Sequence, residues 1–180
     1  MRAVCAKVYG TPDAGDHRVE YDPPEARVIP ALWHSWRGMI LDSLILCDYE
    51  NTRVFSMLSE DGAADTALMA KLFSACTGVQ TSERELDKAG ERIWNLLRAI
   101  DVRNFSRNRA IDESTLDSFM YPGKDDGVML DRAKFLKLLD KYYELSGWDL
   151  ANGWPTRAKL VELGLQEVAD GLEAVGKIGI

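Results

Sequence analysis

The sequence predicts an all-α fold, an irregular bundle of about six or seven helices. Over most of the chain, apolar residues recur three or four positions apart, which is the spacing of one helix face. No segment shows the apolar–polar alternation that is typical of a half-buried strand. Glycine or a helix-capping residue stands at several points where the apolar pattern begins or ends.

The N-terminal part is expected to contain a lead-in followed by a long helix. Residues 1–9 can form a short helix, and residues 10–24, rich in proline and glycine, are expected to form a loop. From Glu25 to Cys47 the apolar residues follow helical spacing. We therefore expect two parts, a lead-in over residues 1–24 and a helical domain over residues 25–180.

Two further helices are expected in the middle of the chain. One begins at Asp65 and ends at Gly78. Its predicted apolar face consists of Leu68, Met69, Leu72, Phe73 and Cys76. The other opens with a capping box, formed by Ser82 and Glu85, and its apolar stripe continues to Ile100.

Three shorter helices are expected after a polar connection at residues 104–113. Asp131 is expected to cap the first of them, which Gly147 would end. Thr156 is expected to cap the second, and the last extends over about residues 166–175.

Composition excludes several classes of protein. A hydrophobic content of 46% is enough for a sizeable core, and no apolar run is long enough to span a membrane. A net charge of −7, spread along the whole chain, argues against binding to nucleic acid or to an anionic membrane. Because the first residues lack the apolar stretch of a signal peptide, we expect a cytoplasmic protein.

The three cysteines, Cys5, Cys47 and Cys76, are too far apart to form a Cys-x-x-Cys metal motif. They cannot by themselves hold a structural zinc ion or a complete iron–sulfur cluster. For Cys5 and Cys76 we expect the common fate of an isolated cysteine, which is burial in the core. Asp42 and Cys47 would point in different directions on a continuous helix, so the helix must end between them if both serve one site.

Other candidate residues indicate little chemistry. Phosphate-binding loops and common hydrolase motifs are absent. His34 is expected on a helix face in an aromatic environment, and His17 in solvent. Asp125 and Asp126, in the turn-rich residues 121–128, lack the rest of a calcium-binding loop. A basic cluster, expected to be a solvated helix end unless it meets an acidic partner, consists of Arg103, Arg107 and Arg109.

Four segments occur in the order found in one enzyme family. Asp42–Cys47 is similar to its motif Asp-x-x-Gly-Leu-Cys, and Gly90–Leu96 to its motif Gly-Glu-Arg-Ile-x-Asn-Leu. Tyr142–Asp149 is similar to Tyr-Tyr-x-x-x-Gly-Trp-Asp, and Gly153–Leu165 to a closing Gly-x-Pro-Thr motif that is followed by leucines. Over about residues 25–176 the chain resembles the C-terminal part of the tungsten-containing aldehyde:ferredoxin oxidoreductase family.

This resemblance implies a role for three residues. Cys47 would be one of four thiolates on a [4Fe–4S] cluster, and Asp42 would accept hydrogen bonds from a pterin of a tungsten or molybdenum bis-pterin cofactor. The backbone of Leu46 and Cys47 would lie between the two redox centres. Ile45 stands where the family has glycine, which changes how closely the backbone can approach the cofactor.

The resemblance also implies that this chain is part of a larger enzyme. The family's N-terminal domain, with its other cluster cysteines and its catalytic glutamate, precedes the region that the chain matches. The partners implied are that N-terminal domain or subunit and a ferredoxin-type electron carrier, and the chain could also be a homo-oligomer. The complete enzyme would oxidise an aldehyde to a carboxylic acid, and the isolated chain, which supplies no catalytic residue, would be inactive.

Two alternatives remain. The chain could be a free-standing helical interaction module without activity, or a separately encoded subunit that completes a split enzyme. An exposed apolar face along residues 31–46 would favour a fragment or a split enzyme, because the missing half would normally cover that face.

Overall fold

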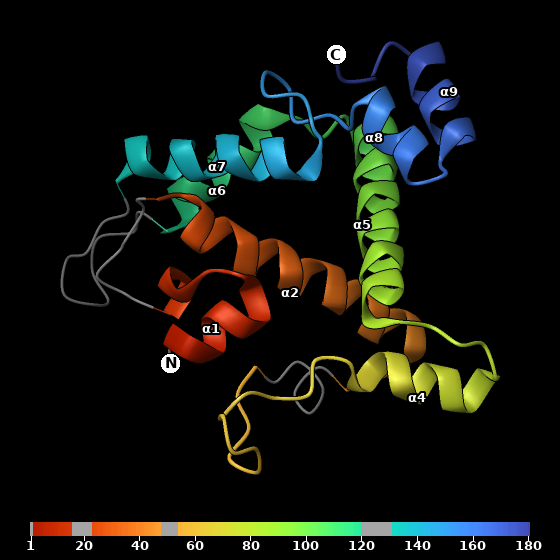
Figure 1. Ribbon diagram of the computed structural model, residues 1–180. Coiled ribbons are helices and arrows are strands. Elements are labelled where there is room, and N and C mark those ends of the chain that lie inside the picture. Colours follow the sequence, from red (N-terminus) through yellow and green to blue (C-terminus); the bar gives the residue numbers. More distant parts are fainter. Residues whose placement is uncertain (1, 16–22, 48–53, 120–130) are drawn as a thin grey trace. The chain divides into compact units, whose positions relative to one another are not determined.

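A computed structural model describes residues 2–15, 23–47, 54–119 and 131–180 of the chain (Figure 1). Within these ranges the fold is all-α, as predicted, with eight α-helices, one 3-10 helix and no strand beyond isolated bridges. His17 and residues 121–128, with Asp125 and Asp126, lie outside the described residues. The chain divides into two compact units, unit 1 (Met1–Trp94) and unit 2 (Asn95–Ile180).

Helix α5 (Glu83–Phe105) contributes its first half to unit 1 and its second half to unit 2. The other elements of unit 1 are α1 (Arg2–Tyr9), the 3-10 helix (Pro12–Gly15), α2 (Glu25–Leu44) and α4 (Leu68–Thr77). The other helices of unit 2 are α6 (Arg109–Phe119), α7 (Arg132–Ser146), α8 (Arg157–Glu162) and α9 (Gln166–Ala174). The predicted division at residue 24 stays a prediction.

The main core of unit 1 forms where α2 meets α4 and the start of α5. Its buried residues are Ile40, Leu41, Met69, Ala70 and Leu86. A second, smaller cluster joins α1 to the segment after residue 53, through Val4, Val54 and Ala63. The apolar face of residues 31–46 is therefore largely covered by the chain itself, and it does not supply the expected sign of a missing half.

Helices α2 and α5 approach each other closely in unit 1 because Gly90 has no side chain. A Cβ atom at this position would lie 2.4 Å from the carbonyl oxygen of Trp36 and 3.0 Å from Cδ1 of Ile40. No real Cβ contact is as short as the first of these, so the crossing of the two helices requires glycine here. Through this crossing, α5 fixes the helix that leads to Asp42.

The core of unit 2 is formed by the second half of α5 and the two C-terminal helices. Its buried residues are Ala99, Val102, Leu160, Leu163, Leu165, Ala169 and Leu172. The Lys177 ammonium group donates hydrogen bonds to the carbonyl oxygens of Val102 and Arg103, which lie in the last turns of α5. Such a cation satisfies carbonyl groups that have no partner within the helix.

The predicted helix starts are confirmed where a side-chain cap was expected. The Ser82 N–H donates to the Glu85 carboxylate at 2.8 Å and the Glu85 N–H to the Ser82 hydroxyl at 3.3 Å, which is a complete capping box. Asp131 accepts a hydrogen bond from the N–H of Lys134, and Thr156 one from the N–H of Lys159. These short-range signals depend only on the local chain, so the sequence reveals them.

Two predictions about elements are wrong. Residues 109–119, expected to begin as a polar connection, form helix α6. In α4 the inward residues are Met69 and Ala70, while Leu68, Leu72 and Cys76 are exposed. Cys76 is therefore not a core residue, although Cys5 is buried as expected. None of the described helices is long and apolar enough to cross a membrane.

Candidate functional site

The segment from Asp42 to Cys47 lies at the C-terminal end of α2. The helix ends at Leu44, so Asp42 is on its last turn and Cys47 lies beyond it. The helix thus ends between the two residues, which is the condition for their serving one site.

Two backbone hydrogen bonds fix the chain as it leaves the helix. The Ile45 N–H donates to the Asp42 carbonyl oxygen at 3.3 Å, and the Leu46 N–H to the Leu41 carbonyl oxygen at 2.9 Å. This pair of bonds is a Schellman motif, and it places Ile45 in the left-handed conformation, with φ 56° and ψ 40°. The Leu46 side chain packs against the main core of unit 1 and so anchors the segment.

The side chains on either side of this anchor face outward. Asp42, Ile45 and Cys47 are all exposed. An exposed carboxylate and an exposed thiol at one helix end can both reach a group that is bound by another part of an enzyme. Within the described residues, no three His, Cys, Asp or Glu side chains gather closely enough to hold a metal ion. Any cluster bound by Cys47 must therefore receive its other thiolates from elsewhere.

The other three family-like segments meet in a buried network of unit 2, centred on Arg98. The Arg98 guanidinium donates to both oxygens of the Asp112 carboxylate, at 3.2 and 2.5 Å, and its Nε donates to the Gly153 carbonyl oxygen at 2.9 Å. The Tyr143 hydroxyl donates to the same carboxylate at 2.6 Å. Burial raises the pKa of Asp112, but the hydrogen bonds from Arg98 and Tyr143 outweigh burial and hold that pKa below its usual range. The carboxylate is therefore ionised, and both of its oxygens accept hydrogen bonds.

Aromatic contacts complete this network. The Trp148 indole N–H donates to the Asn95 amide oxygen at 2.8 Å, and the Arg98 guanidinium lies 4.6 Å from the centre of the Trp148 ring. Gly153 has a φ of 71°, and a Cβ atom there would lie 2.6 Å from Nη2 of Arg98 and 2.7 Å from the Tyr143 ring. The three segments therefore have a structural role, because Asn95 binds Trp148, while Tyr143 and Gly153 bind the Arg98–Asp112 pair.

The basic cluster does not behave as a solvated helix end. Arg107 donates to Asp101 at 3.1 Å and to Asp112 at 2.9 Å. Arg109 donates to Glu113 and Asp140 at 2.7 and 2.6 Å. Two of its arginines thus have acidic partners inside unit 2. Sequence periodicity missed the whole network. Ile100, which was expected on the apolar stripe of α5, is exposed, whereas Asn95, Arg98 and Val102 are buried.

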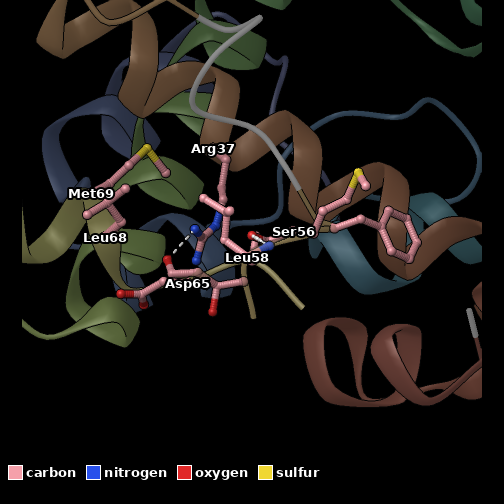
Figure 2. A pocket seen from close by; sticks show the side chains of 10 residues that line it. Arg37, Ser56, Leu58, Asp65, Leu68 and Met69 are labelled. Carbon is pink, nitrogen blue, oxygen red and sulfur yellow. Dashed lines mark hydrogen bonds between the residues drawn. The ribbon is translucent and has the colours of Figure 1, made fainter. Parts of the chain in front are cut away.

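Unit 1 contains a second buried arginine, Arg37, beside a pocket of about 580 Å³. Figure 2 shows the Arg37 side chain reaching from α2 toward Leu58 and Asp65. Its guanidinium donates to the Thr66 carbonyl oxygen and to Glu83, and lies 4.3 Å from the centre of the Trp33 ring. Asp42, Leu46 and Cys47 do not line this pocket, so it is separate from the candidate site.

A carboxylate next to Arg37 shows the cost of partial burial. Asp87 lies 3.2 Å from the Arg37 guanidinium. Burial raises the pKa of Asp87, and nearby Glu83 adds to this, while the attraction of Arg37 opposes it.

His34, on α2, has the expected aromatic environment. Its Nε2 lies 2.9 Å from the Tyr9 hydroxyl, and the centre of its ring is 4.8 Å from that of Trp33.

Comparison with known proteins places these features in context. A family model described as "Aldehyde ferredoxin oxidoreductase, domains 2 & 3" matches residues 2–165. Among solved structures, the chain is similar to one described as "Active site complex BamBC of Benzoyl Coenzyme A reductase in complex with 1,5 Dienoyl-CoA". The TM-score is 0.62 and the sequence identity 25%, and the match covers 83% of this chain. The chain spans only 20% of the length of that protein chain.

Proposed function

The chain belongs to the aldehyde ferredoxin oxidoreductase family, and from this premise we propose that it is the C-terminal part of a bis-pterin tungsten or molybdenum oxidoreductase. In this proposal Cys47 is one ligand of a [4Fe–4S] cluster, Asp42 accepts hydrogen bonds from a pterin, and the backbone of Leu46 and Cys47 lies between the two redox centres. The main support is the exposed thiol and carboxylate at one helix end, in a chain that matches the family over most of its length.

The donor set fits this role in part. Iron–sulfur clusters are held by cysteine thiolates, and Cys47 offers an exposed thiol while Cys5 is buried. An exposed aspartate is an acceptor for paired N–H donors such as those of a pterin. One thiolate cannot hold a cluster, so the remaining ligands would come from the domain that precedes this region in the family.

Bound cofactors would supply the redox chemistry, with single electrons passing through the cluster and a two-electron reaction at the pterin-bound metal. An aldehyde and water would give a carboxylic acid, two protons and two electrons, and two one-electron ferredoxin-type carriers would accept the electrons. The residues of this chain would hold and orient the cofactors. Leu46, which packs against the main core of unit 1, would hold the backbone between Asp42 and Cys47 in place, and so fix the positions of the carboxylate and the thiolate.

A second candidate is a reductive enzyme of the same family. The similar solved structure is described as the active site complex of a benzoyl coenzyme A reductase in complex with 1,5 Dienoyl-CoA. The roles of Asp42 and Cys47 would be the same in both reactions, because neither residue is proposed to touch the substrate.

The experiment that tests the proposal compares two exposed cysteines. The native complex that contains this chain is purified without oxygen, with Cys47→Ser or Cys76→Ser, and its iron, sulfide, tungsten and molybdenum are measured. We expect Cys47→Ser to lose most of the iron, because it removes one cluster ligand. Cys76→Ser should keep the iron, since Cys76 lies on α4, outside the proposed site.

The metal content and the polypeptide composition of the purified complex together separate the alternatives. A complex that contains iron and a second polypeptide indicates a split enzyme, and a single longer polypeptide indicates a fragment. A native protein that contains none of these metals would contradict the proposal and favour the free-standing interaction module. Equal iron content in the Cys47→Ser variant and the unmodified complex would contradict the role of Cys47.

A further inference from the structure

Ile45 combines two unfavourable features, and we propose that it is a contact residue of the assembled enzyme. Its side chain would be covered by the part of the enzyme that supplies the remaining cluster ligands, and it would keep water from the iron–sulfur cluster at Cys47. This inference rests on the proposed function, since it assumes that Cys47 is a cluster ligand.

The first unfavourable feature is the backbone conformation. Ile45 has a φ of 56°, in the left-handed region that disfavours β-branched side chains. Within the described residues, three other segments show the same pair of Schellman hydrogen bonds, and all three place glycine at this position, namely Gly147, Gly164 and Gly176. Glycine would relieve the strain at no steric cost, yet an isoleucine is present.

The second unfavourable feature is exposure of an apolar side chain. Ile45 is 93% exposed, whereas the next residue, Leu46, packs into the core. A single exposed apolar residue is common, but here exposure adds to the backbone strain, and glycine would remove both. Cover by another part of the enzyme would give the isoleucine side chain a role that glycine cannot fill.

The position of Ile45 indicates what would cover it. Successive Cα atoms are 3.8 Å apart, so the Cα of Ile45 lies within about 7.6 Å of the Cα of Cys47. A cluster on the Cys47 thiolate, with its other ligands from another domain, would bring that domain to this helix end. Solvent exposure is one of the factors that set the reduction potential of an iron–sulfur cluster. An apolar side chain at this boundary would lower that exposure.

The test uses the native complex with three substitutions. Ile45→Gly removes the side chain, and Ile45→Val keeps a branched apolar group. Ser106→Gly is the matched control, because Ser106 has the same φ of 56° and lies in unit 2. The rate of iron loss to a chelator and the reduction potential of the cluster are measured in each complex, and the urea midpoint of the 180-residue chain in each variant.

We expect Ile45→Gly to raise the urea midpoint of the isolated chain, because strain is relieved. In the complex the same variant should lose iron about tenfold faster and show a more positive potential, because burial of an isoleucine is lost. Ile45→Val should restore slow iron loss, and Ser106→Gly should leave both cluster properties unchanged.

Three outcomes would overturn the inference. Suppose that the unmodified complex holds a cluster, and that the Ile45→Gly complex loses iron at the same rate and has the same reduction potential. The inferred role of Ile45 is then wrong, while the proposed function stands. If Ile45→Val behaves like Ile45→Gly, an apolar cover is also excluded. If the unmodified complex holds no iron, both this inference and the proposed function fail.

Discussion

Asp112 neutralises the Arg98 guanidinium, which is almost completely buried in unit 2. The side chain of Arg98 is 4% exposed and that of Asp112 is 10% exposed. Removing one partner of a buried ion pair leaves the other charge uncompensated, which costs about 3 kcal/mol or more. We therefore expect Asp112→Asn to lower the free energy of unfolding at neutral pH by at least about 3 kcal/mol, as measured by urea denaturation.

A neighbour on the same helix provides the control for this prediction. Glu113 pairs with Arg109 and Arg132, and its side chain is 24% exposed. More exposed ion pairs contribute little, so Glu113→Gln should cost less than about 1 kcal/mol. Similar losses for the two variants would mean that the Arg98–Asp112 pair is not the centre of the unit 2 network.

At the scale of elements, the crossing of α2 and α5 depends on one glycine. Gly90→Ala would place a methyl group 2.4 Å from the Trp36 carbonyl oxygen, so the helices must move apart. Overpacking of this kind costs about 1–3 kcal/mol. We expect Gly90→Ala to lower the free energy of unfolding by that amount and to change the near-ultraviolet circular dichroism of the tryptophans in α2.

Gly38, on α2, offers the opposite case. Nothing lies within 4 Å of a Cβ atom built at this position. Alanine is the better helix former, so Gly38→Ala should raise the free energy of unfolding by about 0.5–1 kcal/mol. If both alanine variants shift stability in the same direction, the close approach at Gly90 is not what determines the effect.

The elements also show how far sequence patterns reach. Helices α5, α7 and α8 were predictable because each has a capping residue at its start and apolar residues at helical spacing. Helix α6 was not, because its inward residues include Asp112, whose partner Arg98 lies on another helix. Periodicity detects apolar faces, and it is blind to a polar core whose charges meet only after folding.

The candidate site was predictable to a similar degree. The sequence set a condition, that the helix must end between Asp42 and Cys47 if both serve one site, and α2 does end at Leu44. The left-handed conformation of Ile45 was not predictable from the sequence. Glycine is the residue that usually indicates this conformation, and isoleucine, which disfavours it, stands here. The pairing of Arg37 with Glu83 was not predictable either, because these residues are far apart in the sequence and meet only in the folded chain.

For the molecule as a whole, the family-like segments divide into two kinds. Asp42–Cys47 presents exposed side chains in unit 1, whereas Asn95, Tyr143, Trp148 and Gly153 are buried in unit 2. Buried segments serve the fold, and exposed ones can serve contacts beyond the chain. This division supports the proposal that the chain presents one helix end to a cofactor site and uses the other segments to hold its own fold.

Two carboxylates with opposite pKa shifts give each unit its own response to pH. The pKa of Asp112 in unit 2 is lowered from 3.8, so its contribution to stability is present above that value and is lost as the pH falls through the folded-state pKa. The pKa of Asp87 in unit 1 is raised from 3.8, mainly by burial, so the folded state is destabilised as the pH rises through that higher pKa.

These signs predict opposite effects for two matched substitutions. A protonated aspartate resembles asparagine, so Asp87→Asn should match the unmodified chain once the pH has fallen to about 3.8, whereas the deficit of Asp112→Asn should begin to shrink only below 3.8. At pH 7 the Asp112→Asn chain should be less stable, because it lacks a favourable carboxylate. The Asp87→Asn chain should then be equally or more stable, because it lacks a carboxylate that burial disfavours.

Urea denaturation of the 180-residue chain at several pH values between 3 and 7 tests this pair. The decisive quantity is the difference in free energy of unfolding between each variant and the unmodified chain, followed as a function of pH. If Asp87→Asn becomes less stable than the unmodified chain as the pH rises, the attraction between Asp87 and Arg37 outweighs burial. The Arg37 cluster of unit 1 would then be held together in the same way as the Arg98 network of unit 2.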